Sequence, residues 1–264
     1  MMHSSAAATS QDSAQDSRRA ARIEPSTRAE FVLEARGLRK IYGEGSGTIT
    51  VLDGVDFAIA RGEMVAIVAP SGAGKSTFLH LLAALDTPTS GTVYFGSKAI
   101  ESLNEPELAD YRNRAIGFVW QRHHLLADFT AAENVAMPLL MRGRATRESL
   151  AEARRWLAEV GLGERADHLA GQLSGGEQQR AAIARALVHE PAVLLADEPT
   201  GNLDERNASV VFEQMRQLCR AHRLTSVLAT HNWGLARQAD RVLQLENGVL
   251  RPVSQTSNGP GNAV

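Results

Sequence analysis

The apolar residues of this chain follow two patterns. Residues 64–68, 192–196 and 225–229 form short, largely apolar runs without the strict alternation of a half-buried strand. Such runs are typical of parallel strands that helices cover on both faces. They predict an α/β fold built around a mainly parallel sheet.

Alternating and turn-rich segments flank these runs. Between residues 31 and 57, short alternating segments are broken by the glycine-rich stretch 43–47 and by Asp53-Gly54. This pattern predicts an N-terminal antiparallel β subdomain with turns at both breaks. Near the C-terminus, residues 242–245 and 249–250 flank Glu246-Asn247-Gly248, which predicts a hairpin and therefore a mixed sheet.

Helical patterns dominate from about residue 103 to residue 190. The stretch 146–160 is charged and amphipathic, with Leu150, Trp156, Leu157 and Val160 at helical spacing. We expect this region to form an inserted α-helical subdomain, and we expect the stretch 118–130 within it to be a loop.

Composition narrows the functional classes. The 264 residues are 44% hydrophobic and 22% charged, as in an ordinary globular protein. The formal charge of −2 argues against general nucleic-acid binding, because neutralising phosphates requires a basic surface. The single cysteine, Cys219, excludes an intramolecular disulfide, fits a reducing compartment and is expected to pack on a helix.

The two ends of the chain have a different composition from its centre. Residues 1–28 are rich in Ser, Ala, Gln and Asp, and their alanine run is too short for a signal peptide. We expect disordered tails at 1–28 and 254–264, on either side of one domain at 31–253. No stretch approaches the roughly 18 apolar residues of a bilayer span, so a membrane role is expected to come through a partner.

A phosphate-binding loop is the strongest motif. It follows the first apolar run and consists of Ala69, Pro70, Ser71, Gly72, Ala73, Gly74, Lys75, Ser76 and Thr77. Backbone amides and the positive end of the next helix can surround phosphates, Lys75 can neutralise them, and Ser76 can bind Mg²⁺. The motif predicts ATP or GTP binding, although Ala69 stands where glycine is usual; the alternative is a glycine-rich turn between a strand and a helix.

Two carboxylates follow the second apolar run. Asp197 and Glu198 stand at the end of a predicted parallel strand, where open α/β sheets bind ligands. Asp197 would bind Mg²⁺ directly or through water, and Glu198 would polarise the water that attacks the γ-phosphate. A solvated acidic strand end is the alternative, which the upstream phosphate loop disfavours.

A glycine-rich helix start lies just upstream of these acids. Ser174 can cap a helix, Glu177 stands at the reciprocal capping-box position, and Gly175 and Gly176 leave the helix end open to an anion. Considered alone, this motif is also what an ordinary well-capped helix would show.

The order of these motifs resembles the ATP-binding cassette (ABC) family over residues 31–253. The resemblance implies a P-loop NTPase with a RecA-like core that binds ATP and Mg²⁺ and hydrolyses ATP. It also implies that Tyr42 stacks on adenine, that Gln121 contacts Mg²⁺ and the attacking water, and that His231 reaches the γ-phosphate. The alternatives are a packing tyrosine, a surface amide and a strand-end histidine. Asn232 stands where the family usually has Asp.

The same resemblance implies a homodimer that binds two ATP molecules between its subunits. Leu203 and Asp204 would cross to the opposing subunit, and Ser174, Gly175 and Gly176 would complete the site of that subunit. Because the helix start would contact the γ-phosphate, ATP would hold the dimer together and ADP would not.

The segment 118–140 is unusually apolar and aromatic. By resemblance it lines a groove for cytoplasmic helices of transmembrane subunits, with Trp120, Leu125, Leu126 and Phe129 as candidate contacts; packing within the domain is the alternative. The adjacent His123 and His124 lack a further Cys or His at ligand spacing, so we do not expect a metal there.

Within the family, the strings 81–91, 123–140 and 197–204 resemble the ATPase subunits of bacterial lipoprotein-releasing systems. This implies a peripheral homodimer on the cytoplasmic face of the inner membrane, bound to two integral permease subunits that extract lipoproteins destined for the outer membrane. The lipoprotein cargo would be reached only through those subunits.

Three other ABC classes are alternatives to lipoprotein release, and only the first differs from it in its partner alone. A cell-division ABC complex would share this architecture, whereas a macrolide-exporter ATPase is usually fused to its membrane domain. Soluble ABC ATPases of DNA maintenance generally carry long coiled coils or zinc-binding cysteines. The sequence does not determine the membrane subunits, the cargo selectivity, the transport stoichiometry or the role of the N-terminal tail.

Overall fold

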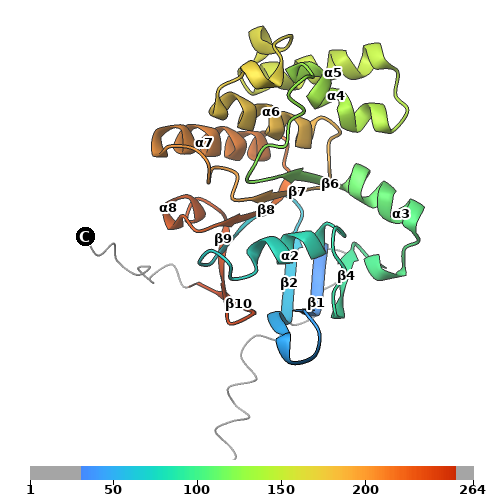
Figure 1. Ribbon diagram of the computed structural model, residues 1–264, viewed down its shortest axis with the longest axis vertical. Helices are drawn as coiled ribbons and strands as arrows, with labels where there is room; N and C mark the ends of the chain where they lie inside the picture. Colours follow the sequence, from blue (N-terminus) through green and yellow to red (C-terminus); the bar gives the residue numbers. More distant parts are fainter. Residues whose placement is uncertain (1–30, 254–264) are drawn as a thin grey trace, which may run out of the picture.

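A computed structural model describes residues 31–253, so the two predicted tails lie outside the described residues. Its central sheet has six strands in the order β10-β9-β3-β8-β7-β6 (Figure 1). The neighbouring pairs from β9 to β6 are parallel, and β10 pairs antiparallel with β9. The strands are β3 (Met64–Val68), β6 (Ile116–Val119), β7 (Val193–Asp197), β8 (Thr225–Thr230), β9 (Arg241–Glu246) and β10 (Val249–Pro252). The three predicted parallel strands, the hairpin and the mixed sheet are confirmed.

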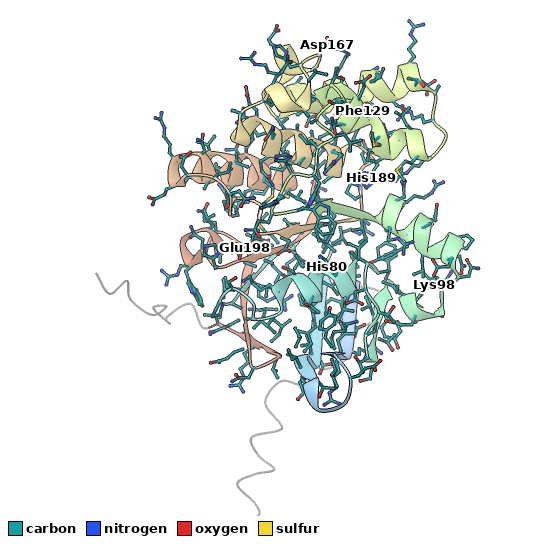
Figure 2. All side chains as sticks on the ribbon, viewed as in Figure 1. His80, Lys98, Phe129, Asp167, His189 and Glu198 are labelled. Atoms are coloured by element: carbon teal, nitrogen blue, oxygen red, sulfur yellow. The ribbon has the colours of Figure 1, made fainter. Side chains whose placement is uncertain are left out.

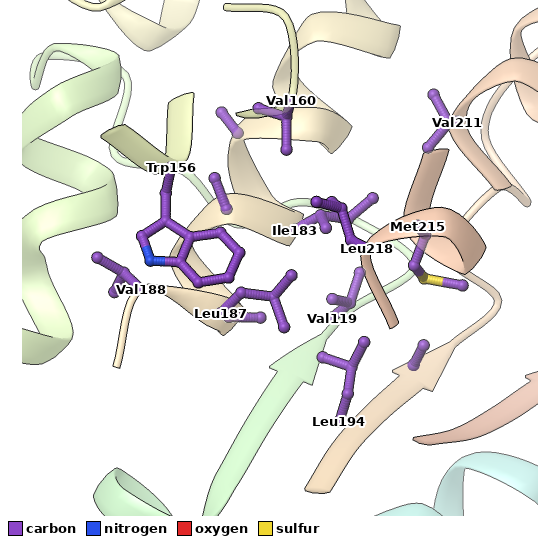
Figure 3. Packing of buried hydrophobic residues seen from close by; sticks show 14 of the residues in the cluster. Val119, Trp156, Val160, Ile183, Leu187, Val188, Leu194, Val211, Met215 and Leu218 are labelled. Atoms are coloured by element: carbon purple, nitrogen blue, oxygen red, sulfur yellow. The ribbon is translucent and has the colours of Figure 1, made fainter. Parts of the chain in front are cut away.

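The central sheet separates two apolar cores. Along β3, Ala66 faces the core on the helical side, whereas Val65 and Ile67 face the other core. Because both faces are covered, all five residues of β3 are buried. Figure 3 shows the helical-side core, where Trp156 and Leu187 pack near the ends of the strands.

A second sheet packs against the opposite face, in the order β2-β1-β4-β5. Its strands are β1 (Phe31–Tyr42), β2 (Ile49–Ala60), β4 (Ser90–Phe95) and β5 (Lys98–Ala99), and all pairs are antiparallel. The pair β1–β2 was predicted, whereas β4 and β5 were missed because they lie outside the segment 31–57. The predicted turn at Asp53-Gly54 is wrong. The register passes from Leu38↔Val55 to Lys40↔Leu52, so β2 carries an extra residue, and Gly54 at φ 75° accommodates this bulge inside one long strand.

The helices form layers on both faces of the central sheet. In Figure 1, α2 lies on the side of the antiparallel sheet, α6 and α7 lie on the other side, and α4 and α5 lie outermost. The helices are α2 (Lys75–Leu82), α3 (Glu105–Asp110), α4 (Ala131–Met141), α5 (Thr146–Glu159), α6 (Gly175–Leu187), α7 (Glu205–Ala221) and α8 (Trp233–Ala236). Short 3₁₀ segments occupy 45–47, 100–102, 163–165 and 170–172, and a π-helical turn spans 111–115. Helix α5 confirms the predicted amphipathic helix, and Cys219 is buried on α7 as expected.

The mostly helical region contains one strand that the sequence analysis missed. Phe118 and Val119, expected in a loop, belong to β6, the edge strand of the central sheet. Four residues are too few for periodicity to separate a buried strand from a helix. Within residues 31–253, none of the helices is long and apolar enough to cross a bilayer.

Candidate active site

The phosphate loop joins β3 to α2, and the backbone conformation at two of its positions requires glycine. Gly72 has φ 78° and Gly74 has φ 103°, conformations that L side chains rarely adopt. A Cβ on Gly74 would also lie 2.6 Å from Cγ1 of Val51. Ala69 does not have a positive φ, which explains why alanine is tolerated there.

Lys75 connects this loop to the second motif. Its buried ammonium donates to the carbonyl oxygens of Ala69 at 2.9 Å and Pro70 at 3.1 Å. It also lies 3.2 Å from Oε1 of Glu198. A single positive charge therefore lies between the phosphate loop and the carboxylate at the end of β7.

Glu198 follows β7 in an uncommon conformation, with φ 45°. Its amide donates to the carbonyl of Ala229 at 2.9 Å. Its Oε2 accepts hydrogen bonds from His231, at 2.9 Å from Nδ1 and 3.3 Å from the backbone nitrogen. Figure 2 labels Glu198 among the side chains of this region. Two side chains, Lys75 and His231, thus hold opposite oxygens of one carboxylate.

Asp197 and Ser76 fit a divalent cation. Asp197 is buried, and its Oδ1 has no hydrogen-bond partner among residues 31–253. Burial raises the pKa of its carboxyl, and a hydrogen bond from Ser76 opposes that rise. A buried carboxylate oxygen without a partner beside a hydroxyl is a donor set that suits Mg²⁺, which takes oxygen ligands.

His80 lies beside this pair and was missed by the sequence analysis. It is one of the groups whose electrostatic interaction with Asp197 lowers the pKa of that carboxyl, against the larger effect of burial, and its ring centroid lies 5.3 Å from that of Trp120. A sequence signal existed, because His80 stands four residues after Ser76 and so shares its face of α2.

Tyr42 and Gln121 lie at two edges of this cluster. The half-exposed Tyr42 donates from its hydroxyl to Oδ2 of Asp86 at 2.6 Å. Partial burial and that hydrogen bond raise the pKa of Tyr42. Gln121 follows β6, and its Nε2 lies 3.1 Å from the position that a Cβ on Gly201 would take. Their predicted roles toward adenine and water stay predictions.

Ser174, Gly175, Gly176 and Asp204 form a second group. Ser174 caps α6 in the predicted capping box with Glu177, and Asp204 caps α7. A Cβ on Gly175 would lie 3.7 Å from Cδ2 of Leu203, so the two helix starts are adjacent. Among the described residues, no hydrogen bond or ion pair joins this group to the phosphate loop. Within one chain, these residues therefore make no polar contact with Lys75, Asp197 and Glu198 among the contacts of the described residues.

The departure at Asn232 does not disturb the local structure. Its side-chain oxygen accepts from the amide of Leu235 at 3.1 Å and caps the short helix α8. A neutral oxygen is sufficient for this cap, so aspartate is not required at this position.

The four candidate partner contacts divide into two pairs. Trp120 packs against Phe118, with ring centroids 4.1 Å apart, and Leu125 packs against the helical-side core. Leu126 and Phe129 are 46% and 42% exposed. Packing within the domain thus covers part of the first two, and the latter two are the more exposed candidates for a partner contact.

A family model described as ABC transporter matches residues 52–201, more than half of the chain. This chain belongs to the ABC transporter family. The match includes the phosphate loop, the Gln121 segment, the Ser174 helix start and the two carboxylates. It confirms the resemblance inferred from motif order, and with it ATP as the nucleotide of this ABC protein.

Relatives of this ABC protein include proteins named "Lipoprotein-releasing system ATP-binding protein LolD". The protein from Koribacter versatilis is 52% identical over 83% of this chain and 99% of its own length. The one from Xanthomonas euvesicatoria is 49% identical over 90% of this chain and 98% of its own length.

Solved structures of ABC proteins share the fold. A dimeric post-hydrolysis state of the ATP-binding cassette MJ0796, bound to ADP and Pi, has a TM-score of 0.77 at 35% identity. It covers 86% of this chain and all of its own. The predicted P-loop NTPase core with its mixed sheet is thus confirmed.

Proposed function

We propose that this chain is the ATP-hydrolysing subunit of an ABC transporter complex that releases lipoproteins destined for the outer membrane from the bacterial inner membrane. The similarity to proteins named LolD supports this assignment, because this chain is about half identical to them over nearly their whole length. In this assignment the chain is a peripheral subunit on the cytoplasmic face of that membrane.

The placement of Glu198 between Lys75 and His231 supports the hydrolytic role. A carboxylate at a strand end beside a phosphate loop is suited to orient a water toward the γ-phosphate. When phosphates bind, the Lys75 ammonium contacts a phosphate oxygen in place of Glu198. The Glu198 carboxylate is then free to bind the water. His231, next to the same carboxylate, hydrogen-bonds the γ-phosphate.

The remaining site residues bind and orient ATP. Residues 69–77 enclose the phosphates and Tyr42 stacks on the base. Ser76, Asp197 and Gln121 would hold Mg²⁺, which when bound neutralises charge on the phosphate oxygens. The partnerless Oδ1 of Asp197 supports this assignment.

The second group of residues supports a homodimer. Ser174, Gly175 and Gly176 lie next to the start of α7 at Asp204, and no hydrogen bond among the described residues ties them to the Lys75 cluster, as expected if they serve the site of an opposing subunit. The solved relatives include dimers of an ATP-binding cassette. Two integral permease subunits complete the complex and carry all contact with lipoprotein.

The test is to isolate tagged Glu198→Gln protein with ATP from gently solubilised membranes of its own cell and to identify copurifying chains by mass spectrometry. We expect two integral subunits together with outer-membrane lipoproteins. Lys75→Ala, which weakens nucleotide binding, is the matched control and should lose the ATP-dependent part of this set.

Two other results would change the assignment. A division-type membrane partner without lipoproteins would keep the ATPase and overturn the cargo. Purified wild-type protein that hydrolyses no ATP would overturn the enzymatic role itself.

A further inference from the structure

The segment after β6 that carries Gln121 is held through its backbone oxygens. Nε2 of Gln179 donates to the carbonyl of Trp120 at 3.3 Å, and Nδ2 of Asn202 donates to that of Gln121 at 2.8 Å. Two nitrogens of Arg185 donate to the carbonyls of His123 and His124, at 2.6 and 2.7 Å. Side chains from two other elements therefore determine the course of this segment.

Arg185 belongs to α6, the helix that begins at Ser174. Among residues 31–253, no carboxylate lies within 4.0 Å of its guanidinium, and burial lowers its pKa. Removing a cation from water without an anionic partner is costly, so its two hydrogen bonds must offset much of that cost. Both bonds go to the Gln121 segment.

Asn202 belongs to the loop between Glu198 and Asp204. The residue is exposed, and its amide donates to the carbonyl of Gln121 itself. The preceding Gly201 lies under the Gln121 side chain, because a Cβ there would come within 3.1 Å of Nε2. The loop after Glu198 thus contacts Gln121 through both backbone and side chain.

We propose that Asn202 and Arg185 are positioning residues, which hold the Gln121 backbone so that its side chain lies over Gly201 beside Glu198. The inference rests on the proposed function, since it assigns these bonds a purpose in ATP hydrolysis. It adds a physical connection: a shift of α6, or of the loop before Asp204, moves Gln121 with it. The two segments expected to contact the opposing subunit are therefore coupled to the Gln121 of their own chain.

Hydrogen exchange of the nucleotide-free protein tests the connection directly. In Asn202→Ala, exchange of the amides in residues 121–126 should become about tenfold faster while the central sheet is unaffected. Arg185→Lys keeps the charge but cannot donate to two carbonyls in the same geometry, and should accelerate exchange at 123–126. Asn104→Ala is the matched control, because Asn104 caps α3 and has no contact with this segment.

Steady-state kinetics tests the purpose of the bonds. Asn202→Ala should lower kcat about tenfold and leave KM for ATP nearly unchanged, since misplacing a group that acts on the reacting water costs rate rather than binding. Asn202→Asp should lower kcat at least as much, because its carboxylate faces a carbonyl oxygen. Asn104→Ala should retain the wild-type kcat.

Unchanged exchange at 121–126 in both variants would overturn the inference. So would faster exchange with an unchanged kcat, which would make the bonds purely structural. Wild-type protein without ATPase activity would instead overturn the proposed function, while the exchange data would still decide whether the two side chains hold the segment.

Discussion

At the scale of single residues, the active-site cluster depends on one strained glutamate. Glu198 adopts a positive φ that non-glycine residues rarely take, and three groups hold it there: the carbonyl of Ala229, Lys75 and His231. Such conformations persist where the surrounding structure compensates their cost, and they concentrate at functional sites. Because these groups fix the position of Glu198, a substitution there should change the chemistry of the site more than the fold.

Replacing Glu198 by Gln should slow ATP turnover by about a hundredfold or more, because the positioned base is lost. ATP binding should persist, since Lys75 is relieved of a competing anion. Phosphate release and titration calorimetry measure the two quantities, with Lys75→Ala as the variant in which binding itself weakens. Wild-type turnover in Glu198→Gln would remove Glu198 from the mechanism.

The buried His189 makes the free energy of unfolding depend on pH. It follows α6, its Nε2 donates to the carbonyl of Ile116 at 3.1 Å, and its buried Nδ1 has no partner in the described part of the chain. Burial lowers its pKa from the usual 6.5 to about 4. Between these values the unfolded chain binds a proton that the folded chain does not, so stability is lost as the pH falls from about 6.5 toward about 4.

We expect His189 to cost about 2 kcal/mol of unfolding free energy at pH 5 relative to pH 8. Urea denaturation at the two pH values measures this loss, and His189→Gln should show a smaller one because glutamine does not titrate. An equal loss in both proteins would assign the pH dependence to other groups.

At the scale of elements, α6 connects most of the functional segments. Ser174 caps its start, Gln179 and Arg185 of its last turn hold the Gln121 segment, and Ala186 packs against Gly117 of β6. The two ends of α6 contact different groups: Ser174 lies at the start of the helix, and Ala186 at its end packs against Gly117 of β6. Changes at the two ends should therefore have different effects.

Ser174→Arg should preserve ATP binding and prevent dimer formation in the Glu198→Gln background, because a long cation would block the helix start. Loss of the cap should also cost about 1 kcal/mol of stability. Light scattering with ATP measures the dimer. Thr130→Arg is the control, since Thr130 caps α4 with the same capping box and should leave the dimer intact. An ATP-dependent Ser174→Arg dimer would contradict the shared site.

Gly117→Ala should destabilise the contact between β6 and α6 by about 3 kcal/mol, because its Cβ has no room. That atom would lie 2.3 Å from the carbonyl oxygen of Ala186, a backbone atom that cannot rotate away. Urea denaturation measures the change. At Gly163 an added Cβ meets nothing closer than 3.7 Å, so Gly163→Ala should change stability by less than about 1 kcal/mol. Similar effects at both sites would contradict this packing argument.

At the scale of the whole molecule, an exposed apolar patch lies on the helical side. Leu126, Phe129 and Leu169 are each more than 40% exposed. They are neighbours, because the amide of Phe129 donates to the carbonyl of Leu126 and a β-bridge pairs Thr130 with Leu169. Contiguous exposed apolar side chains commonly mark a surface that binds a partner. This patch is where we expect a permease subunit to bind.

Phe129→Glu should abolish copurification of the integral subunits while the isolated protein keeps its ATPase activity, since a charge at the patch opposes burial. Pull-down from membranes and phosphate release measure the two effects. Val210→Glu is the control, because Val210 is 54% exposed on α7, away from the patch. Retained membrane partners in Phe129→Glu would exclude the patch as the permease contact.

Local sequence alone determined much of this protein. The phosphate loop, the capping boxes and the uninterrupted strands β3, β7 and β8 are visible because each depends on residues close in the chain. The same holds for the family, whose motifs occur in a characteristic order. Local patterns were insufficient where the structure of a segment depends on the strand beside it. Gly54 forms a bulge because β2 pairs with β1, and residues 116–119 form a strand because they pair with the edge of β7.

Only the tertiary structure decided how the motifs combine. Lys75, Glu198 and His231 are far apart in sequence, and they meet because parallel strands bring their carboxyl ends to one edge of the sheet. Asn202 and Arg185 on the Gln121 segment have no motif that would reveal them, and the spacing of His80 from Ser76 places it on the same helix face without showing that it lies near Asp197. Their contacts join separate elements, so packing in three dimensions, rather than spacing along the chain, determines them.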